Sequence, residues 1–254
     1  MTDTTSLALT EVAEGVHRLE HAFVNVYLVT GDDGRVTVVD TGLPATWNLL
    51  GHALRRLGHR PSDIAAVVLT HAHFDHTGSA ARAQSVLGVP IWLHGQDFEV
   101  AAHPARYAHE NMRAWYPLRY PAALPILAAM VRAGALRVPG VRGTQHVQPG
   151  AVLPVPGSPR VVFTPGHTAG HCALHLPDRD VLLTGDALVT LDPYTGRRGP
   201  QVVAGAATAD SAQALRSLDA LAATGAGTLL PGHGEPWTGP IDAAVEEARA
   251  VGAH

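Results

Sequence analysis

Side chains of the types that bind metal ions follow apolar runs at several places in this 254-residue sequence. The seven that we single out are His71, His73, Asp75, His76, His167, Asp186 and His233. Because buried strands fix the residues just beyond their ends, we expect these side chains to converge on one rigid rim. Imidazole nitrogens and carboxylate oxygens are ligands of borderline divalent cations such as zinc, so the pattern predicts a metal site.

The spacing favours two cations that share one carboxylate. Alternate residues of an extended strand end point to the same side, so His71 and His73 can act together. We assign to the first cation His71, His73 and His167. We assign to the second cation Asp75, His76 and His233. Asp186 can bridge both with its two oxygens.

The charge of this ligand set with two divalent cations supports hydrolysis. Bound divalent cations lower the pKa of water to about 7 and polarise a carbonyl group. Their residual positive charge would stabilise the oxyanion that forms when water attacks. We assign to Asp75 the further role of moving a proton from the attacking water to the leaving group.

The elements that must position these residues alternate between apolar runs and helical segments, which is typical of an α/β or layered α+β fold. We predict strands over residues 23–30, 35–39, 64–70, 91–93, 161–164, 172–176, 181–184 and 228–230. We predict helices over residues 44–57, 79–87, 208–223 and 241–251. Proline and glycine are dense at 149–159, where we place the seam between two halves.

The motif HAHFDH at 71–76, with Asp40 upstream and His167, Asp186 and His233 downstream, resembles the metallo-β-lactamase superfamily. The resemblance covers nearly the whole chain except residues 97–147. It implies one domain over residues 1–254, an α+β four-layer αβ/βα sandwich of two half-domains with the metals at one edge. The bridging carboxylate points to the branch that resembles glyoxalase II and acyl-homoserine-lactone lactonases.

The resemblance also implies roles for residues around the metals. Asp40 would orient a ligand histidine or its loop, although a turn-forming Asp before Gly42 is an equal alternative. Tyr194 would donate a hydrogen bond to the substrate, as tyrosines do in related lactonases. Its offset from Asp186 differs from the expected one, so we favour a loop tyrosine that packs its ring.

Residues 97–147 have weak strand signals and are rich in aromatic side chains. The aromatic residues considered for substrate binding are Phe98, Tyr107, Trp115, Tyr116 and Tyr120. We predict helices over 107–115 and 122–135, interrupted by prolines. The segment is either a lid that lines an apolar acyl pocket or a subunit interface with a small core of its own. We favour the lid, because insertions at this place in the family lie over the metals.

We therefore predict a dinuclear metal hydrolase with two Zn²⁺, or alternatively Fe or Mn, that cleaves an ester, lactone or thioester of a small organic acid. The alternative function is a mononuclear iron oxidoreductase resembling persulfide dioxygenases, which keep the HxHxDH pattern. All 18 basic residues are Arg, which excludes Schiff-base and P-loop lysine chemistry. The net charge of −4 argues against a nucleic-acid partner.

The sequence also indicates where the protein works. The most apolar stretch, residues 122–136, is too short to span a membrane and contains Pro125 and Arg132. Residues 1–15 are polar and do not read as a secretory signal, so we expect a cytoplasmic protein. A small-molecule substrate is the expected partner, and a homodimer is compatible with the sequence.

Overall fold

The computed structural model describes residues 8–254, and its strands form two main sheets and one short hairpin. The first sheet contains, in spatial order, β1 (Leu9–Ala13), β2 (Val16–His21), β3 (Val24–Thr30), β4 (Val36–Val39), β5 (Ile64–Val68), β6 (Ile91–His94) and β7 (Gln145–Val147). The second contains β14 (Trp237–Thr238), β13 (Thr228–Pro231), β10 (Val181–Gly185), β9 (Cys172–Leu176) and β8 (Arg160–Phe163). The hairpin pairs β11 (Val189–Leu191) with β12 (Arg198–Gln201).

The strand directions explain why ligands gather at one edge. Strands β1 to β4 pair antiparallel, whereas β4, β5, β6 and β7 pair parallel. In the second sheet β10 and β13 are also parallel neighbours. Parallel neighbours end at the same edge of their sheet, so the loops after β10 and β13 lie side by side.

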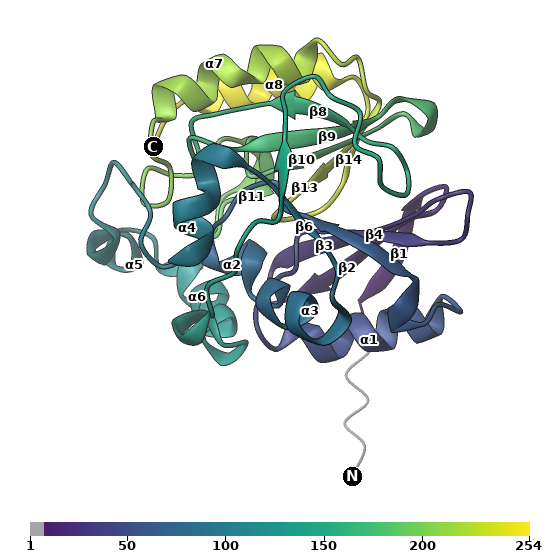
Figure 1. Cartoon of the computed structure of the whole chain (residues 1–254). Helices are drawn as coiled ribbons and strands as arrows, with labels where there is room; N and C mark the ends of the chain where they lie inside the picture. Colours follow the sequence, from purple (N-terminus) through teal and green to yellow (C-terminus); the bar gives the residue numbers. More distant parts are fainter. Residues whose placement is uncertain (1–7) are drawn as a thin grey trace.

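The two sheets pack face to face, and helices cover their outer faces (Figure 1). The helices are α1 (Thr46–Arg56), α2 (Phe74–Thr77), α3 (Ala80–Leu87), α4 (Phe98–Ala102), α5 (Tyr116–Arg119), α6 (Leu124–Arg132), α7 (Ser211–Ala222) and α8 (Ile241–Val251). Helices α1 and α3 lie over the first sheet and α7 and α8 over the second, which gives the four layers of the predicted sandwich.

Side-chain alternation along the strands builds the layers. In β10, Val181 and Leu183 pack between the two sheets, whereas Leu182 faces α7 and α8. In β3, Leu28 faces α1 while Val29 faces the second sheet. Successive side chains of a strand point to opposite faces, and here both faces are buried, so apolar side chains occur on both faces of these strands.

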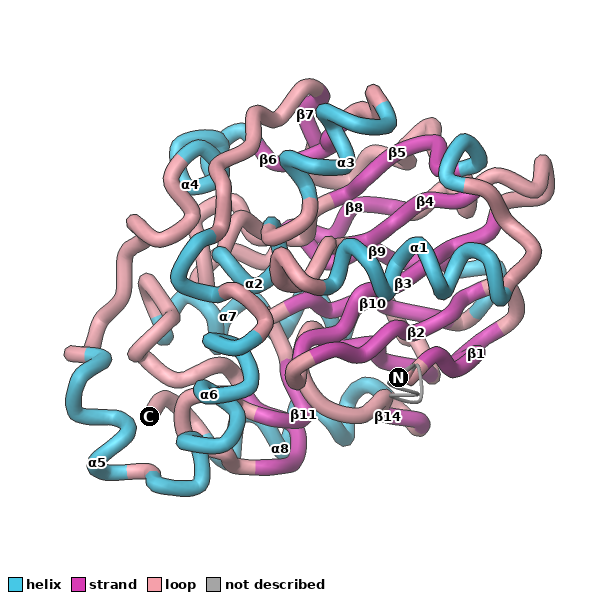
Figure 2. Tube along the Cα trace, turned by 90° about the horizontal axis from the view of Figure 1, so that it is seen from below, coloured by secondary structure: helices cyan, strands magenta, loops and turns pink. Residues whose placement is uncertain are grey.

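The segment 97–147 differs from the prediction in its helices. Residues 107–112 form a loop rather than the first part of a helix over 107–115, and only a 3₁₀ turn follows at Arg113–Trp115. The helix predicted over 122–135 is shorter and is α6. In Figure 2, α4, α5 and α6 gather at one end of the sheets. The sequence pattern does not predict the strands β1, β2, β7, β11, β12 and β14 as separate elements.

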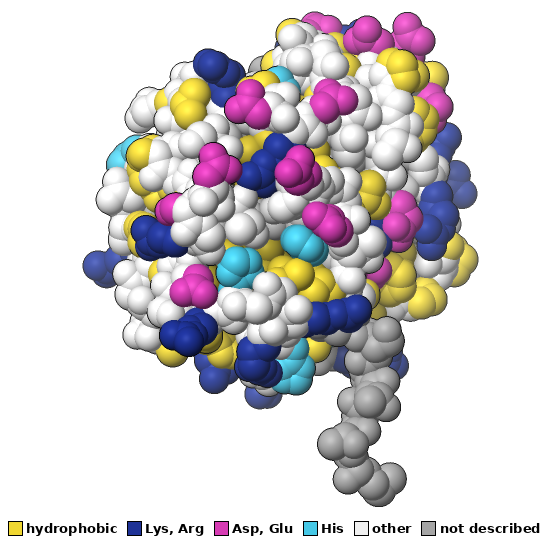
Figure 3. All heavy atoms as spheres, turned by 90° about the vertical axis from the view of Figure 1, so that its right-hand side faces the viewer, with side chains coloured by type: hydrophobic (Ala, Val, Ile, Leu, Met, Phe, Trp, Pro, Cys, Tyr) yellow, Lys and Arg dark blue, Asp and Glu magenta, His cyan; other side chains and the backbone are white. Residues whose placement is uncertain are grey.

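Acidic and arginine side chains are interspersed over the face drawn in Figure 3. Within residues 8–254, every helix is too short or too polar to cross a membrane. The predicted lack of a secretory signal concerns residues 1–15, of which 1–7 lie outside the described residues. The cytoplasmic location and the homodimer stay predictions.

Candidate metal centre

The structure brings all seven predicted ligand side chains into one buried cluster. Four of them lie on the loop after β5 and on α2, which together span 69–77, while His167 follows β8, Asp186 follows β10 and His233 follows β13. None of the seven residues is more than 6% exposed. Strand ends from both sheets therefore supply the cluster, as the sequence pattern indicates.

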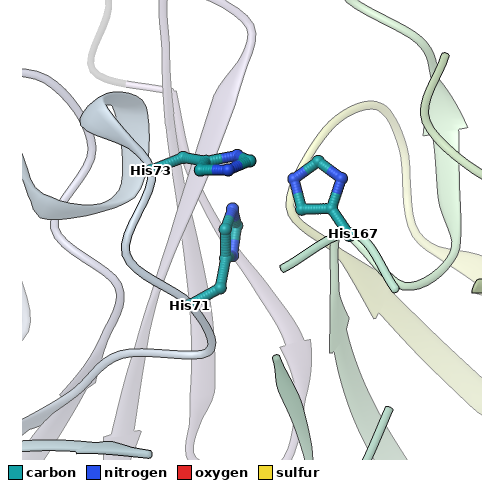
Figure 4. A group of neighbouring side chains, drawn as sticks. All are labelled: His71, His73 and His167. Atoms are coloured by element: carbon teal, nitrogen blue, oxygen red, sulfur yellow. The ribbon is translucent and has the colours of Figure 1, made fainter. Parts of the chain in front are cut away.

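The ligand atoms fall into three groups, in each of which they lie within 4.8 Å of one another. The first group is His71, His73 and His167. The second group is Asp75, His76 and His233. The third group, which links the other two, is His71, His76 and Asp186. Figure 4 shows the first group: two rings on one loop face a third ring that comes from the second sheet.

The carboxylate of Asp186 lies between the two outer groups. Its Oδ2 atom is 3.4 Å from Nε2 of His167 and 3.3 Å from Nε2 of His233. Its Oδ1 atom is 3.4 Å from Nε2 of His76. None of these separations is a hydrogen bond, since Oδ1 and the Nε2 atoms have no hydrogen-bond partner among residues 8–254. Asp186 therefore has the position expected of a bridging ligand.

Hydrogen bonds at Nδ1 turn the Nε2 atoms of four rings inward. Nδ1 of His76 contacts Asp40 at 2.8 Å, and Nδ1 of His233 contacts the carbonyl oxygen of Phe23 at 2.7 Å. A carbonyl only accepts, so His233 must carry its proton on Nδ1 when neutral, which leaves the lone pair on Nε2. Nδ1 of His71 and of His167 each contact a threonine hydroxyl, at 3.0 and 3.2 Å.

The inward atoms fit a pair of cations. Six buried polar atoms of the cluster have no hydrogen-bond partner among the described residues: Oδ1 of Asp186 and Nε2 of His71, His73, His76, His167 and His233. Each unpaired buried polar atom costs about 1–3 kcal/mol, so this concentration of them in one place needs an explanation. Imidazole nitrogens and carboxylates suit zinc and similar metals, and bound cations would satisfy these atoms.

Burial and charge divide the histidines into two sets. Burial lowers the pKa of His71 and His73 and lowers that of His167 to about 4, so these rings are neutral and able to bind a cation. Burial also acts to lower the pKa of His233, but the Asp186 and Asp75 carboxylates outweigh it and raise that pKa to about 10. The same negative charges would attract cations.

Asp40 supports the cluster from behind. Its backbone has a φ of 57°, in the left-handed region, and its carboxylate is buried. Oδ2 accepts from Oγ1 of Thr70 at 2.9 Å and from Nδ1 of His76, while Oδ1 accepts from the Thr70 amide at 2.8 Å. The carboxylate thus fixes both the start of the ligand loop and the ring of His76, the geometry expected for orienting a ligand.

A glycine allows the chain to pass close to the cluster. A Cβ atom at Gly232 would lie 2.2 Å from Oδ1 of Asp186 and 2.8 Å from Cε1 of His76. A real Cβ atom does not tolerate such distances, so only glycine fits next to His233 without displacing the neighbouring ligands.

Two of the predicted substrate-binding residues lie over the cluster. The ring of Tyr107 is 3.7 Å from that of His73, and its hydroxyl is 3.1 Å from the hydroxyl of Tyr194. The Arg113 guanidinium lies 4.0 Å from the Tyr107 ring in a cation–π contact. The Tyr194 ring packs against Tyr116 and its hydroxyl bonds to the residue that covers His73, while a hydrogen bond from Tyr194 to a substrate stays a prediction.

The other aromatic residues of the segment lie further away. Tyr116 packs against Tyr120 and Tyr194, one layer outside Tyr107. Trp115 is 63% exposed. Phe98 packs against His146, with ring centres 4.5 Å apart, and against the core between the first sheet and its helices. The structure does not bring Phe98 to the aromatic wall around Tyr107 and Tyr194.

Two further buried residues accept hydrogen bonds from the backbone of the loops that carry the cluster, and the residue pattern assigned a role in the metal site to neither. Nε2 of His171 accepts a hydrogen bond from the backbone N–H of Asp186 at 3.0 Å, and its Nδ1 contacts Oγ1 of Thr164 at 2.8 Å. The second is Asp97, a buried carboxylate just after β6. The position of His171, four residues after His167, is a sequence signal for a supporting role. Asp97 lies in a turn, and the sequence carries no comparable signal for it.

The chain belongs to the metallo-beta-lactamase superfamily, because the model of that family matches residues 20–233. It is 28% identical over 246 residues to the probable metallo-hydrolase YflN of Bacillus subtilis (strain 168), a match that covers 90% of this chain and 87% of that protein. It is also 28% identical over 144 residues to the N-acyl homoserine lactonase AiiA of Bacillus thuringiensis subsp. kurstaki. That match covers 56% of this chain and 45% of the lactonase, so it spans less than half of that relative.

A solved structure agrees with the family and with the fold. The metallo-beta-lactamase family protein TTHA1429 from Thermus thermophilus matches with a TM-score of 0.68 and 29% identity, over 95% of this chain and 80% of that chain. The predicted resemblance and the predicted sandwich are both confirmed.

Proposed function

We propose that this protein is a metal-dependent hydrolase that holds two divalent cations, zinc in the first instance, and cleaves an ester, lactone or thioester of a small organic acid. The observation that supports this best is the set of six unpaired inward atoms grouped around the Asp186 carboxylate. Membership of the metallo-beta-lactamase superfamily and the similarity to a probable metallo-hydrolase support hydrolysis in general.

The residues around the cluster have separable roles in this proposal. The first group would hold one cation, the second group the other, and Asp186 would bridge them. Cations held there supply Lewis acidity and lower the pKa of water. Burial acts to raise the pKa of Asp75, but the neighbouring His233 and His76 outweigh it and lower that pKa, so the carboxylate is ionised. The Oδ2 atom of Asp75 lies 3.4 Å from Nε2 of His233. In this proposal it accepts the proton that leaves the attacking water.

The wall beside the cluster favours an apolar acyl group. Tyr107 packs with the buried residues Val189, Val203 and Ala207, and Tyr194 lies against them. The Tyr107 and Tyr194 hydroxyls are polar groups of this wall beside the Arg113 guanidinium, and an O–H there can donate to a substrate oxygen. The names of the lactonase relatives describe a lactone substrate that carries an acyl chain. The wall is suited to such a substrate.

Metal analysis combined with a substrate screen tests the proposal. Protein purified without added metal should hold two divalent cations per chain, and a chelator should abolish hydrolysis of lactones, thioesters or aryl esters until zinc is restored. Asp186→Asn should lower both occupancy and turnover, whereas His175→Ala, which removes a histidine of β9 outside the cluster, should lower neither. One iron per chain with oxygen uptake would instead favour the persulfide-dioxygenase-like alternative, and a chain that binds no cation at saturating zinc would refute metal chemistry.

A further inference from the structure

The first ligand group combines side chains from both halves of the sandwich. His71 and His73 lie on the loop after β5 of the first sheet, whereas His167 lies on the loop after β8 of the second sheet. Their Nε2 atoms must keep a fixed separation to bind one cation, and ligand positions within about 0.5 Å matter for such a site. Contacts that join these two loops therefore have a direct effect on the group.

One carboxylate makes such a contact. Asp97 lies in the 3₁₀ turn Gly95–Asp97 that follows β6, and it is fully buried. Its Oδ2 atom accepts from the backbone N–H of Ala72 at 3.0 Å and from Oγ1 of Thr168 at 2.7 Å. Its Oδ1 atom accepts from the backbone N–H of Gly170 at 2.8 Å.

The donors are adjacent in sequence to the ligands. Ala72 lies between His71 and His73, and Thr168 directly follows His167. We infer that Asp97 is a positioning residue that sets the distance between the two ligand loops of the first group; this rests on the proposed metal site. Its three hydrogen bonds hold the loop of one sheet against the loop of the other.

The chemistry of the site requires a carboxylate. Three donors converge on Asp97, and an ionised carboxylate has only acceptor atoms, whereas an amide would turn an NH₂ group toward one of the donors. Gly170 is matched to it, because a Cβ atom there would lie 2.6 Å from Oδ1 of Asp97. Burying a carboxylate without partners is costly, and the three bonds offset that cost.

A second hydrogen bond, which does not involve Asp97, also joins the two loops. The backbone N–H of Cys172 donates to the carbonyl of Thr70 at 2.8 Å, so the two loops keep one connection when the carboxylate is altered. Asp40 differs from Asp97, since its bonds to Thr70 and His76 lie within the first half. Loss of Asp97 should therefore affect the first ligand group more than the second.

The experiment measures the affinities of the two zinc ions separately, by chelator competition on the full chain. Asp97→Asn should weaken one of the two ions about 10- to 100-fold and leave the other within a few-fold of wild type. Hydrogen exchange of the metal-free protein should be faster at the amides of Ala72 and Gly170. Asp192→Asn is the matched control, because that carboxylate is also fully buried and also accepts three hydrogen bonds, and both zinc affinities should stay unchanged.

Several results would overturn the inference. Two zinc affinities that fall together, or that both stay at wild-type values while the Ala72 and Gly170 amides exchange at the wild-type rate, contradict a positioning role. If Asp97→Asn does not fold, Thr168→Val removes a single bond and should give a smaller loss confined to the same ion; equal loss at both ions is again contradictory. A wild-type chain that binds no zinc would refute the proposed function itself, which separates the two failures.

Discussion

Replacing Asp40 with Asn should weaken zinc binding while the chain stays folded. The carboxylate accepts from Nδ1 of His76 at 2.8 Å and makes two bonds to Thr70. An amide oxygen can keep the bond to the Thr70 backbone, and the Thr70 hydroxyl can rotate to accept from the NH₂ group. The same NH₂ group, however, faces the N–H of His76 and repels it.

The Asp40→Asn change therefore disfavours a proton on Nδ1 of His76 in its present orientation. If the proton shifts to Nε2, the lone pair that should bind the cation is lost, and if it stays on Nδ1 the ring must turn away. Altering such a supporting partner typically costs about 10- to 100-fold in metal affinity, or about 1.4–2.8 kcal/mol. The lost charge-assisted bond costs about 1.5–3 kcal/mol of stability, which is less than the roughly 5–15 kcal/mol typical of a folded domain.

Chelator competition with zinc and urea unfolding of the metal-free protein measure the two effects separately. Asp192→Asn again serves as the control, since its buried amide should cost stability without changing zinc affinity. An Asp40→Asn variant that binds both zinc ions as tightly as wild type would refute an orienting role for Asp40. A loss of stability without a loss of affinity would make Asp40 a purely structural residue.

Three further predictions follow from individual contacts. Asp75→Asn should reduce turnover about 10²- to 10⁴-fold at full zinc occupancy, and unchanged steady-state kinetics in a sample of verified metal content would contradict the proton-transfer role. Gly232→Ala places a methyl group 2.2 Å from a carboxylate oxygen of the cluster and should lower zinc occupancy. The contrasting variant is Gly51→Ala in α1, where the new methyl group meets only a side-chain tip at 3.8 Å. That variant should raise the free energy of unfolding by about 1 kcal/mol in urea titrations. The hydrogen bond to Asp192 raises the pKa of His254 above its ordinary value of 6.5, so its contribution to stability is full below pH 6.5 and is lost as the pH rises through the raised pKa. The difference in unfolding free energy between wild type and His254→Gln should therefore shrink with rising pH, and a difference that grows would contradict this linkage.

The clustering of the seven proposed ligand side chains could be predicted because chemistry and chain pattern coincide at them. Each apolar run forms a strand, and a proposed ligand follows close to the strand end, as Asp186 does after the fully buried β10. Parallel pairing of β10 with β13 then places Asp186 and His233 at the same edge. Residue type, order and the position after a strand were enough, without knowledge of the pairing itself.

The segment 97–147 could not be predicted in the same way, because tertiary contacts decide its local structure. Tyr107 lies in a loop although its surroundings read as a helix, since its ring packs on His73 and its hydroxyl bonds to Tyr194. Nε of Arg113 donates to the carbonyl of Ala206, which ties the segment to a loop far away in sequence. Helix propensities of about a few tenths of a kcal/mol per residue do not compete with such contacts.

The roles of His171 and Asp97 could not be predicted from the sequence for a different reason. His171 and Asp97 act on backbone N–H groups of other loops, so their effect depends on how the two sheets pack and not on any spacing along the chain. Asp40 was named from the sequence only because the resemblance to the superfamily implies a role for it, and its partners Thr70 and His76 lie in the same half of the chain. It follows that the ligand set is encoded locally in each strand end, whereas the distance between His73 and His167 is encoded in the packing of the halves. A substitution that shifts this packing should therefore alter cation binding even when every ligand is retained.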